Sequence, residues 1–258
     1  KKMLSNLIEI VVLSLVQGVT EFLPISSSAH LNIVETIFKY NSNSLMIDVS
    51  LHLGSLLAII FYFRKDLLNL KNNHKLLLLI SIGSIPIIIS GYILYTTKLI
   101  FVLKNNLEII AWMTLIFGII LYFADKCKFD KKINPNLNLK IILYIGFFQI
   151  LALIPGVSRA GITISAARIF RFNRVDAGKI SFLMAIPALA GASALNLKDI
   201  FDQNFELNYL VFISVTLSFI FSYLTVKFFL HYINKSSLNI FVIYRIIIAM
   251  ILFKIIYF

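Results

Sequence analysis

Six stretches of this chain are apolar for long enough to cross a lipid bilayer. They cover roughly residues 45–63, 76–97, 107–124, 178–196, 209–227 and 239–257. A helix needs about 20 apolar residues to span the hydrocarbon core, and in lipid only helices or closed barrels satisfy every backbone polar group. These runs predict an all-α polytopic membrane protein that forms one integral membrane domain over residues 1–258.

The composition agrees with this prediction. Charged residues make up 14% of the 258 residues and hydrophobic residues 59%, whereas a soluble domain carries about 25% charged residues. The net charge of +12 is best explained by basic loops facing anionic lipid. Nucleic acid is not an expected partner, because no cluster of basic and aromatic residues lies outside the apolar framework. The single cysteine, Cys127, excludes an intramolecular disulfide.

Two further apolar stretches do not fit as full spans. Residues 7–23 end at Pro24 and residues 139–154 end at Pro155, and serines and another helical stretch follow at once. Two short helical arms joined at a proline are typical of a re-entrant hairpin. Because Pro24 and Pro155 are 131 residues apart, about half the chain, we predict two repeats, about 1–125 and 138–258. Each repeat is a re-entrant helix hairpin followed by three transmembrane helices.

The number of crossings fixes the relative orientation of these repeats. Three crossings per half place the two halves in opposite orientations, and interrupted helices at matching positions of inverted repeats point to a site near the membrane midplane. Fifteen Lys and Arg residues, between Arg64 and Lys235, fall in segments predicted to face the cytoplasm. The outward segments hold six: Lys1, Lys2, Lys39, Lys98, Lys104 and Lys198. The positive-inside rule therefore predicts that both termini face outward.

The first hairpin, QGVTEFLPISSSAHL (17–31), concentrates polar side chains. Gln17 and Glu21 are four residues apart and share one helix face. Pro24 ends that helix and Ser26 is a suitable N-cap for the next, whose free backbone N–H groups would form an anion site. His30 lies one turn past Ser26 and Ser27, so we expect it to face the same spot.

The second hairpin, LIPGVSRAGITIS (153–165), supplies a cation. Gly156 lies in the predicted turn and Ser158 can cap the following helix, on which Arg159 and Thr163 share one face. An arginine at mid-membrane depth costs ~2.5–3.5 kcal/mol on insertion scales, so it needs a partner or a function. Its planar set of donors suits a phosphate group.

A purely structural interpretation also exists for each of these features. Serines after a proline are common helix starts, a lone histidine on an apolar helix usually packs, and Glu21 and Arg159 can simply neutralise each other. The convergence of a carboxylate, hydroxyls, an imidazole, an arginine and two helix N-termini at one depth favours a functional site.

At these residues the chain resembles the bacitracin-resistance type of undecaprenyl-diphosphate phosphatase. The family's first motif matches Gln17, Glu21, Pro24, Ser26, Ser27 and His30. Its second motif matches Pro155, Gly156, Ser158, Arg159, Gly161 and Thr163. The likeness extends over nearly the whole chain, through LHLGSLLAIIFYFRKDL and FQILALIPG. The chain departs from the usual pattern at Gln17, where many members have Glu, and at Ala160, where Ser is common.

The resemblance implies hydrolysis of the C55 isoprenoid diphosphate to the monophosphate lipid carrier. It implies a site that opens to the outer face of the bacterial cytoplasmic membrane, and a divalent cation, Mg²⁺ or Ca²⁺, held by Glu21 with Gln17. Ser27 is then the candidate nucleophile and His30 the base or acid, with a metal-activated water as the other attacking group. Arg159 would stabilise the transferred phosphoryl group. Gln17, Ser26, Gly156, Ser158 and Thr163 would contact the substrate.

Two questions stay open at the level of sequence. Inverted repeats with broken helices are also a transporter architecture, so a secondary transporter or lipid-carrier flippase is the alternative function. The partners expected are the lipid substrate and membrane lipids, and homodimerisation is left open.

Overall fold

The computed structural model describes residues 2–38, 45–99, 106–129, 131–201 and 209–257. Within these ranges the chain is helical, apart from its loops and one isolated β-bridge between Lys131 and Phe172. The first half contains α1 (Lys2–Thr20), α2 (Ser27–Phe38), α3 (Leu45–Tyr62), α4 (Arg64–Leu68), α5 (Leu70–Thr96) and α7 (Leu107–Lys126). The second half contains α8 (Ile133–Asn136), α9 (Leu139–Ile150), a 3₁₀ turn (Leu151–Leu153), α10 (Arg159–Ile169), α11 (Arg174–Phe201), α12 (Tyr209–Lys235) and α13 (Asn239–Tyr257).

Five of the described helices are long and apolar enough to span a membrane: α5, α7, α11, α12 and α13. The chain is thus a helical, multi-pass membrane protein. The sixth predicted span, 45–63, corresponds to α3, which falls in the class of shorter apolar helices with the arms Leu7–Thr20 and Leu139–Leu153. Helix ends also differ from the predicted spans, since α11 begins at Arg174 and α12 continues to Lys235. Apolar runs mark the part of a helix that lies in lipid, whereas the helix itself continues into polar sequence.

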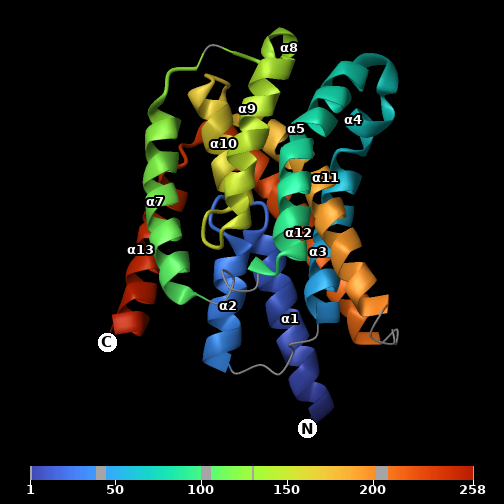
Figure 1. Cartoon of the computed structure of the whole chain (residues 1–258), viewed down its shortest axis with the longest axis vertical. Coiled ribbons are helices and arrows are strands. Elements are labelled where there is room, and N and C mark those ends of the chain that lie inside the picture. Colours follow the sequence, from blue (N-terminus) through green and yellow to red (C-terminus); the bar gives the residue numbers. More distant parts are fainter. Residues whose placement is uncertain (1, 39–44, 100–105, 130, 202–208, 258) are drawn as a thin grey trace.

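The two broken segments enter the molecule from opposite ends. Figure 1 shows α1 and α2 at the end that holds both termini, and α9 starting near α8 at the other end. The loop that joins α1 to α2 and the loop that joins α9 to α10 both lie in the middle of the molecule. The helices around them therefore enclose residues 21–26 and 151–158.

Close helix packing holds this arrangement together. α12 packs against α1 and α3, α5 packs against α9 and α11, and α7 packs against α13. Gly54 of α3 makes one such contact, because a Cβ there would collide with the carbonyl oxygen of Val215 in α12. Gly54 is thus a close helix contact made by a small residue, as is common in membrane proteins.

Large hydrophobic side chains cover much of the outer surface. Phe212 is 73% exposed and Phe123 is 65% exposed, values that are unfavourable in water and suit contact with lipid chains. Buried small and polar residues, by contrast, line the helix contacts inside, among them Ser55, Ser218 and Ser222.

An ion-pair cluster joins helix ends on the far side of the molecule from the termini. The buried carboxylate of Asp125 accepts hydrogen bonds from Arg174 Nε at 2.7 Å and Nη2 at 2.9 Å, and from the backbone N–H of Leu238 at 3.0 Å. Arg168, at the end of α10, lies 3.5 Å from the same carboxylate. This cluster fixes the C-terminal end of α10, and so the depth at which Arg159 begins that helix.

Candidate active site

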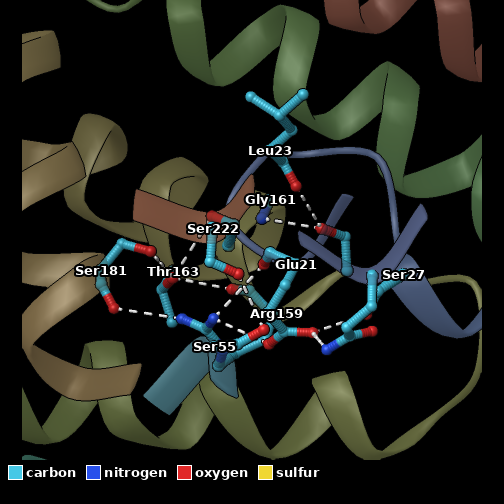
Figure 2. A network of polar contacts seen from close by, with 12 residues as sticks. Glu21, Leu23, Ser27, Ser55, Arg159, Gly161, Thr163, Ser181 and Ser222 are labelled. Carbon is cyan, nitrogen blue, oxygen red and sulfur yellow. Dashed lines mark hydrogen bonds and ion pairs between the residues drawn. The ribbon is translucent and has the colours of Figure 1, made fainter. Parts of the chain in front are cut away.

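The centre of the site is an ion pair between the two hairpins. Arg159 Nη2 lies 3.1 Å from Glu21 Oε1, and the two side chains are 10% and 7% exposed. Glu21 follows the last turn of α1, and Arg159 is the first residue of α10. Figure 2 shows the two side chains pointing toward each other. The structure therefore brings together the two charged residues that the sequence singled out.

Two further donors complete the surroundings of Glu21. Ser27 Oγ donates to Glu21 Oε2 at 2.7 Å, and Gln17 Nε2 donates to the same oxygen at 3.2 Å. A buried carboxylate is tolerated only where such donors and a cation replace its hydration. Gln17, Glu21, Ser27 and Arg159 form a single cluster, hereafter the Glu21 cluster.

The guanidinium of Arg159 makes several hydrogen bonds, but one of its N–H groups has no acceptor among the described residues. Its Nη1 donates to the carbonyl oxygen of Ser181 at 3.3 Å, and Nη2 also reaches the carbonyl oxygen of Glu21 at 3.4 Å. Within the part of the chain that the structure describes, its buried Nε has no hydrogen-bond partner. A buried guanidinium N–H without an acceptor is costly, so the site is suited to an incoming oxyanion.

Arg159 and Thr163 both bond Ser181, as expected of two residues four apart that share one helix face. The Thr163 hydroxyl is 2.7 Å from both the carbonyl oxygen of Arg159 and the hydroxyl of Ser181. Thr163 is fully buried, so its observed contacts fix α10 against α11.

Both loops carry a serine in the left-handed backbone region. φ is 75° at Ser26 and 69° at Ser158, a conformation that costs a residue with a Cβ roughly 1–2 kcal/mol. Each serine directly precedes a helix, and Ser158 Oγ caps α10 by accepting from Gly161 N at 3.1 Å. The predicted cap at Ser158 is confirmed, and Ser26 holds the matching position before α2. By its position directly before a helix, Ser158 corresponds to Ser26. By the spacing of 131 residues between the two halves, Ser158 corresponds instead to Ser27.

Glycine is required at the second loop. Gly156 has φ +92°, and a Cβ there would lie 2.5 Å from the carbonyl oxygen of Ile110. Ser158 Oγ also lies 3.5 Å from the carbonyl oxygen of Leu23, which links the two loops directly (Figure 2). The turn predicted at Pro155 and Gly156 is thus present.

His30 lies on the first turn of α2, three residues after Ser27, and its partners differ from those expected. Its Nδ1 bonds the carbonyl oxygen of Ser26 at 2.7 Å, and its Nε2 bonds the hydroxyl of Tyr244 at 2.7 Å. The imidazole had been expected to face Ser27, but the Ser27 proton goes to the carboxylate of Glu21, the stronger acceptor. The ring instead turns toward α13.

Arg245, also on α13, is a residue at the junction of the two loops that the sequence analysis missed. The side chain is fully buried, and its donors reach the carbonyl oxygens of Pro24 at 3.2 Å, Val157 at 3.1 Å and Gly156 at 2.9 Å. One guanidinium therefore fastens both loops. The argument applied to Arg159, that an arginine inside an apolar span needs a partner or a function, would have found it.

The residues fit a divalent cation only in part. Gln17 Oε1 is buried and lacks a partner among the described residues, and it lies on the same side chain that bonds Glu21. Amide and carboxylate oxygens are suitable ligands for Mg²⁺ or Ca²⁺. Across the described ranges no group of three His, Cys, Asp or Glu side chains is placed to bind a metal. Further ligands would have to come from a substrate or water.

The fold and the cluster together define a class: a multi-pass helical membrane protein with a buried carboxylate, guanidinium and hydroxyl where two broken helix pairs meet. The chain belongs to the family described as bacitracin resistance protein BacA, whose model matches residues 10–251.

Several curated relatives are similar over nearly their full length. A protein of Pelagibacter ubique named undecaprenyl-diphosphatase is 75% identical over 99% of this chain and 100% of its own. Proteins with the same name from Elusimicrobium minutum and Saccharophagus degradans are 39% and 37% identical, over 94% and 98% of this chain and 95% and 99% of their own.

Proposed function

We propose that this chain hydrolyses undecaprenyl diphosphate to undecaprenyl phosphate and inorganic phosphate. The observation that carries the proposal is the 75% identity, over the full length, to a protein named undecaprenyl-diphosphatase. The Glu21 cluster adds a chemical reason, because Arg159 Nε, which has no partner among the described residues, can bond a phosphoryl oxygen next to the hydroxyl of Ser27.

Each member of the cluster has a part in this reaction. Arg159 binds the terminal phosphoryl group and stabilises its charge during transfer. Ser27 Oγ attacks the terminal phosphorus, its proton passes to Glu21 Oε2, and the bond from that phosphorus to the bridging oxygen breaks. Undecaprenyl phosphate leaves. Water, which gives up a proton to His30, then attacks the phosphoserine; the bond from phosphorus to Ser27 Oγ breaks, inorganic phosphate leaves, and Oγ takes back the proton held by Glu21. The 2.7 Å bond from Ser27 to Glu21 is the contact that this proton transfer needs.

A divalent cation is the proposed cofactor. Gln17 Oε1 and the carboxylate of Glu21 would hold it together with oxygens of the diphosphate. When bound, it would neutralise part of the charge on the two phosphates. Gln17 is neutral where many family members carry a second carboxylate, so this chain is expected to hold the cation more weakly.

The architecture proposed for the membrane is a pair of inverted repeats, each with a re-entrant hairpin. Two observations support it. α1 packs on α12 as α9 packs on α5, so the first arm of each half contacts the corresponding helix of the other half. The two return helices both begin after a serine with positive φ. Such a pair would bring the diphosphate to the middle of the bilayer while the lipid tail stays among the helices.

The location proposed is the bacterial cytoplasmic membrane, with the site open to its outer face. The charge distribution of the loops supports this orientation. Gln17, Glu21, Ser27 and Arg159 all come from one chain, so the reaction as proposed does not require a homodimer. A transporter or flippase has no support from the named relatives.

A phosphate-release assay tests the function. Purified protein in detergent micelles is given undecaprenyl diphosphate with Mg²⁺ or Ca²⁺, and inorganic phosphate is measured over time. A phosphatase works without two membrane faces, so we expect multiple turnovers. If the solubilised protein releases no phosphate with either cation, the proposed function is wrong.

A further inference from the structure

A tyrosine outside the recognised motifs is bonded to the imidazole of His30. Tyr244 lies on α13, and its hydroxyl is 2.7 Å from His30 Nε2. The two rings are nearly parallel, at 8°, with their centroids 5.5 Å apart. The contact joins α2 to a helix that lies more than 200 positions later in the chain, so it depends on the tertiary fold.

The partners of the imidazole determine where its proton lies. Nδ1 faces the carbonyl oxygen of Ser26 at 2.7 Å, and a carbonyl oxygen can only accept. Nδ1 of the neutral ring therefore carries the proton, and Nε2 presents its lone pair. The hydroxyl of Tyr244 is then the donor to Nε2. Tyr244 and Ser26 together fix both the tautomer and the orientation of His30.

The residues next to His30 and Tyr244 in this contact are also held in place. The Ser26 carbonyl belongs to the residue with φ 75°, which is the junction of the first loop and α2. Arg245, the residue after Tyr244, bonds the carbonyl oxygens of both loops. Two consecutive residues of α13 thus hold the loops and the imidazole.

We infer that Tyr244 is a positioning residue for His30 in the phosphatase reaction. The inference rests on the proposed function, and it assigns Tyr244 no direct contact with the substrate. Its hydroxyl holds Nε2 so that the imidazole stays at a fixed place and in one tautomer on the first turn of α2, which also carries Ser27. Misplacing a catalytic group by about 1 Å can cost on the order of 100-fold in rate.

The first experiment compares Tyr244→Phe with Tyr257→Phe. Both tyrosines lie on α13 and both hydroxyls make a 2.7 Å bond, which in Tyr257 goes to Glu108. Phosphate release from undecaprenyl diphosphate in detergent should show kcat reduced at least ~10-fold with KM nearly unchanged in Tyr244→Phe. Tyr257→Phe should match the wild type. A normal kcat in Tyr244→Phe overturns the inference, as does a raised KM with normal kcat.

A double-mutant comparison separates positioning from general damage. In a His30→Gln background, the further change Tyr244→Phe should lower the residual rate by less than about twofold, because the imidazole that Tyr244 positions is absent. An equal loss in both backgrounds means that Tyr244 acts on the fold rather than through His30, which contradicts the inference.

A spectroscopic measurement does not need turnover. In ¹⁵N-histidine-labelled protein, the His30 signal, identified by its loss in His30→Gln, should show an unprotonated Nε2 that accepts a hydrogen bond. That signal should shift in Tyr244→Phe and stay in place in Tyr257→Phe. An Nε2 signal unaffected by Tyr244→Phe overturns the inference.

Failure of the proposed function and failure of this inference give different results. A wild type that releases no phosphate overturns the proposed function and the role of Tyr244 with it. An active wild type together with a Tyr244→Phe variant of normal activity overturns only the role of Tyr244.

Discussion

At the scale of single residues, the site depends on one carboxylate that serves several partners. Glu21 accepts from Ser27, Gln17 and Arg159 while it is nearly excluded from solvent. An ion pair this deep gains little stability over apolar packing, because desolvation offsets most of the attraction. The desolvation cost of burying Glu21 and Arg159 has a function if the two residues exchange partners with an anionic substrate.

Arg159→Lys tests the phosphate role of the guanidinium. Lysine keeps the charge, but it cannot reach Glu21, Ser181 and a phosphoryl oxygen with a planar set of donors. We expect phosphate release to fall at least ~10-fold, equivalent to ~1.4 kcal/mol, while the thermal unfolding midpoint stays near that of the wild type. Unchanged turnover would mean that Arg159 is only a counter-ion for Glu21.

Glu21→Gln and Gln17→Ala separate the carboxylate from its neighbour. Glu21 supplies the negative charge of the Glu21 cluster, and it receives the Ser27 proton in the proposed reaction. Glu21→Gln should therefore lose more activity than Gln17→Ala, and its remaining activity should respond differently to Mg²⁺ or Ca²⁺ concentration. The measurement is a cation titration of phosphate release for both variants. A Glu21→Gln variant with the wild-type titration curve would exclude the carboxylate as a ligand.

At the scale of helices, α13 organises the two loops. Arg245 donates to carbonyl oxygens of both hairpin loops and to the carbonyl oxygens of Met113 and Thr114 in α7. Loop carbonyls buried in a membrane protein have no water to bond, so this guanidinium replaces the hydration of several groups at once.

Replacing Arg245 should therefore destabilise the fold. Arg245→Met leaves buried carbonyls without donors at a cost of about 1–3 kcal/mol for an unsatisfied group. We expect a clearly lower midpoint of thermal unfolding in detergent. Lys254→Met, a similar change at an exposed position on the same helix, is the control and should unfold as the wild type does. Equal midpoints for the two variants would contradict the role given to Arg245.

The sequence predicted elements better than it predicted contacts. Apolar runs located the long helices, and Pro24, Pro155 and Ser158 located the loops, because lipid length and turn chemistry are local properties. The partner of His30 could not be found this way, since Tyr244 is one of eleven tyrosines and only the fold brings it to α2.

At the scale of the whole molecule, the two termini lie at the same end (Figure 1), as the six predicted crossings require. The charge distribution predicts that this end faces outward. Cys127 lies at the end of α7 near the opposite end, with a partly exposed thiol. It should therefore face the cytoplasm.

Thiol labelling in cells tests that orientation. A membrane-impermeant maleimide should label Cys127 only after the cells are opened. In a Cys127→Ser background, Lys98→Cys, at an exposed residue after α5, should be labelled in intact cells. The reverse pattern would invert the topology and place the site on the cytoplasmic side.

The central claim is that the point where the two hairpins meet is the phosphatase site, and two adjacent serines test it most directly. Ser27 Oγ donates to Glu21, whereas Ser28 Oγ lies 3.3 Å from Ser26 Oγ. The measurement is the initial rate of phosphate release from undecaprenyl diphosphate by the wild type, Ser27→Ala and Ser28→Ala in detergent. We expect Ser27→Ala to be at least ~100-fold slower and Ser28→Ala to stay within about twofold of the wild type, as for substitutions away from the reacting groups. A Ser27→Ala variant with wild-type turnover would contradict the account.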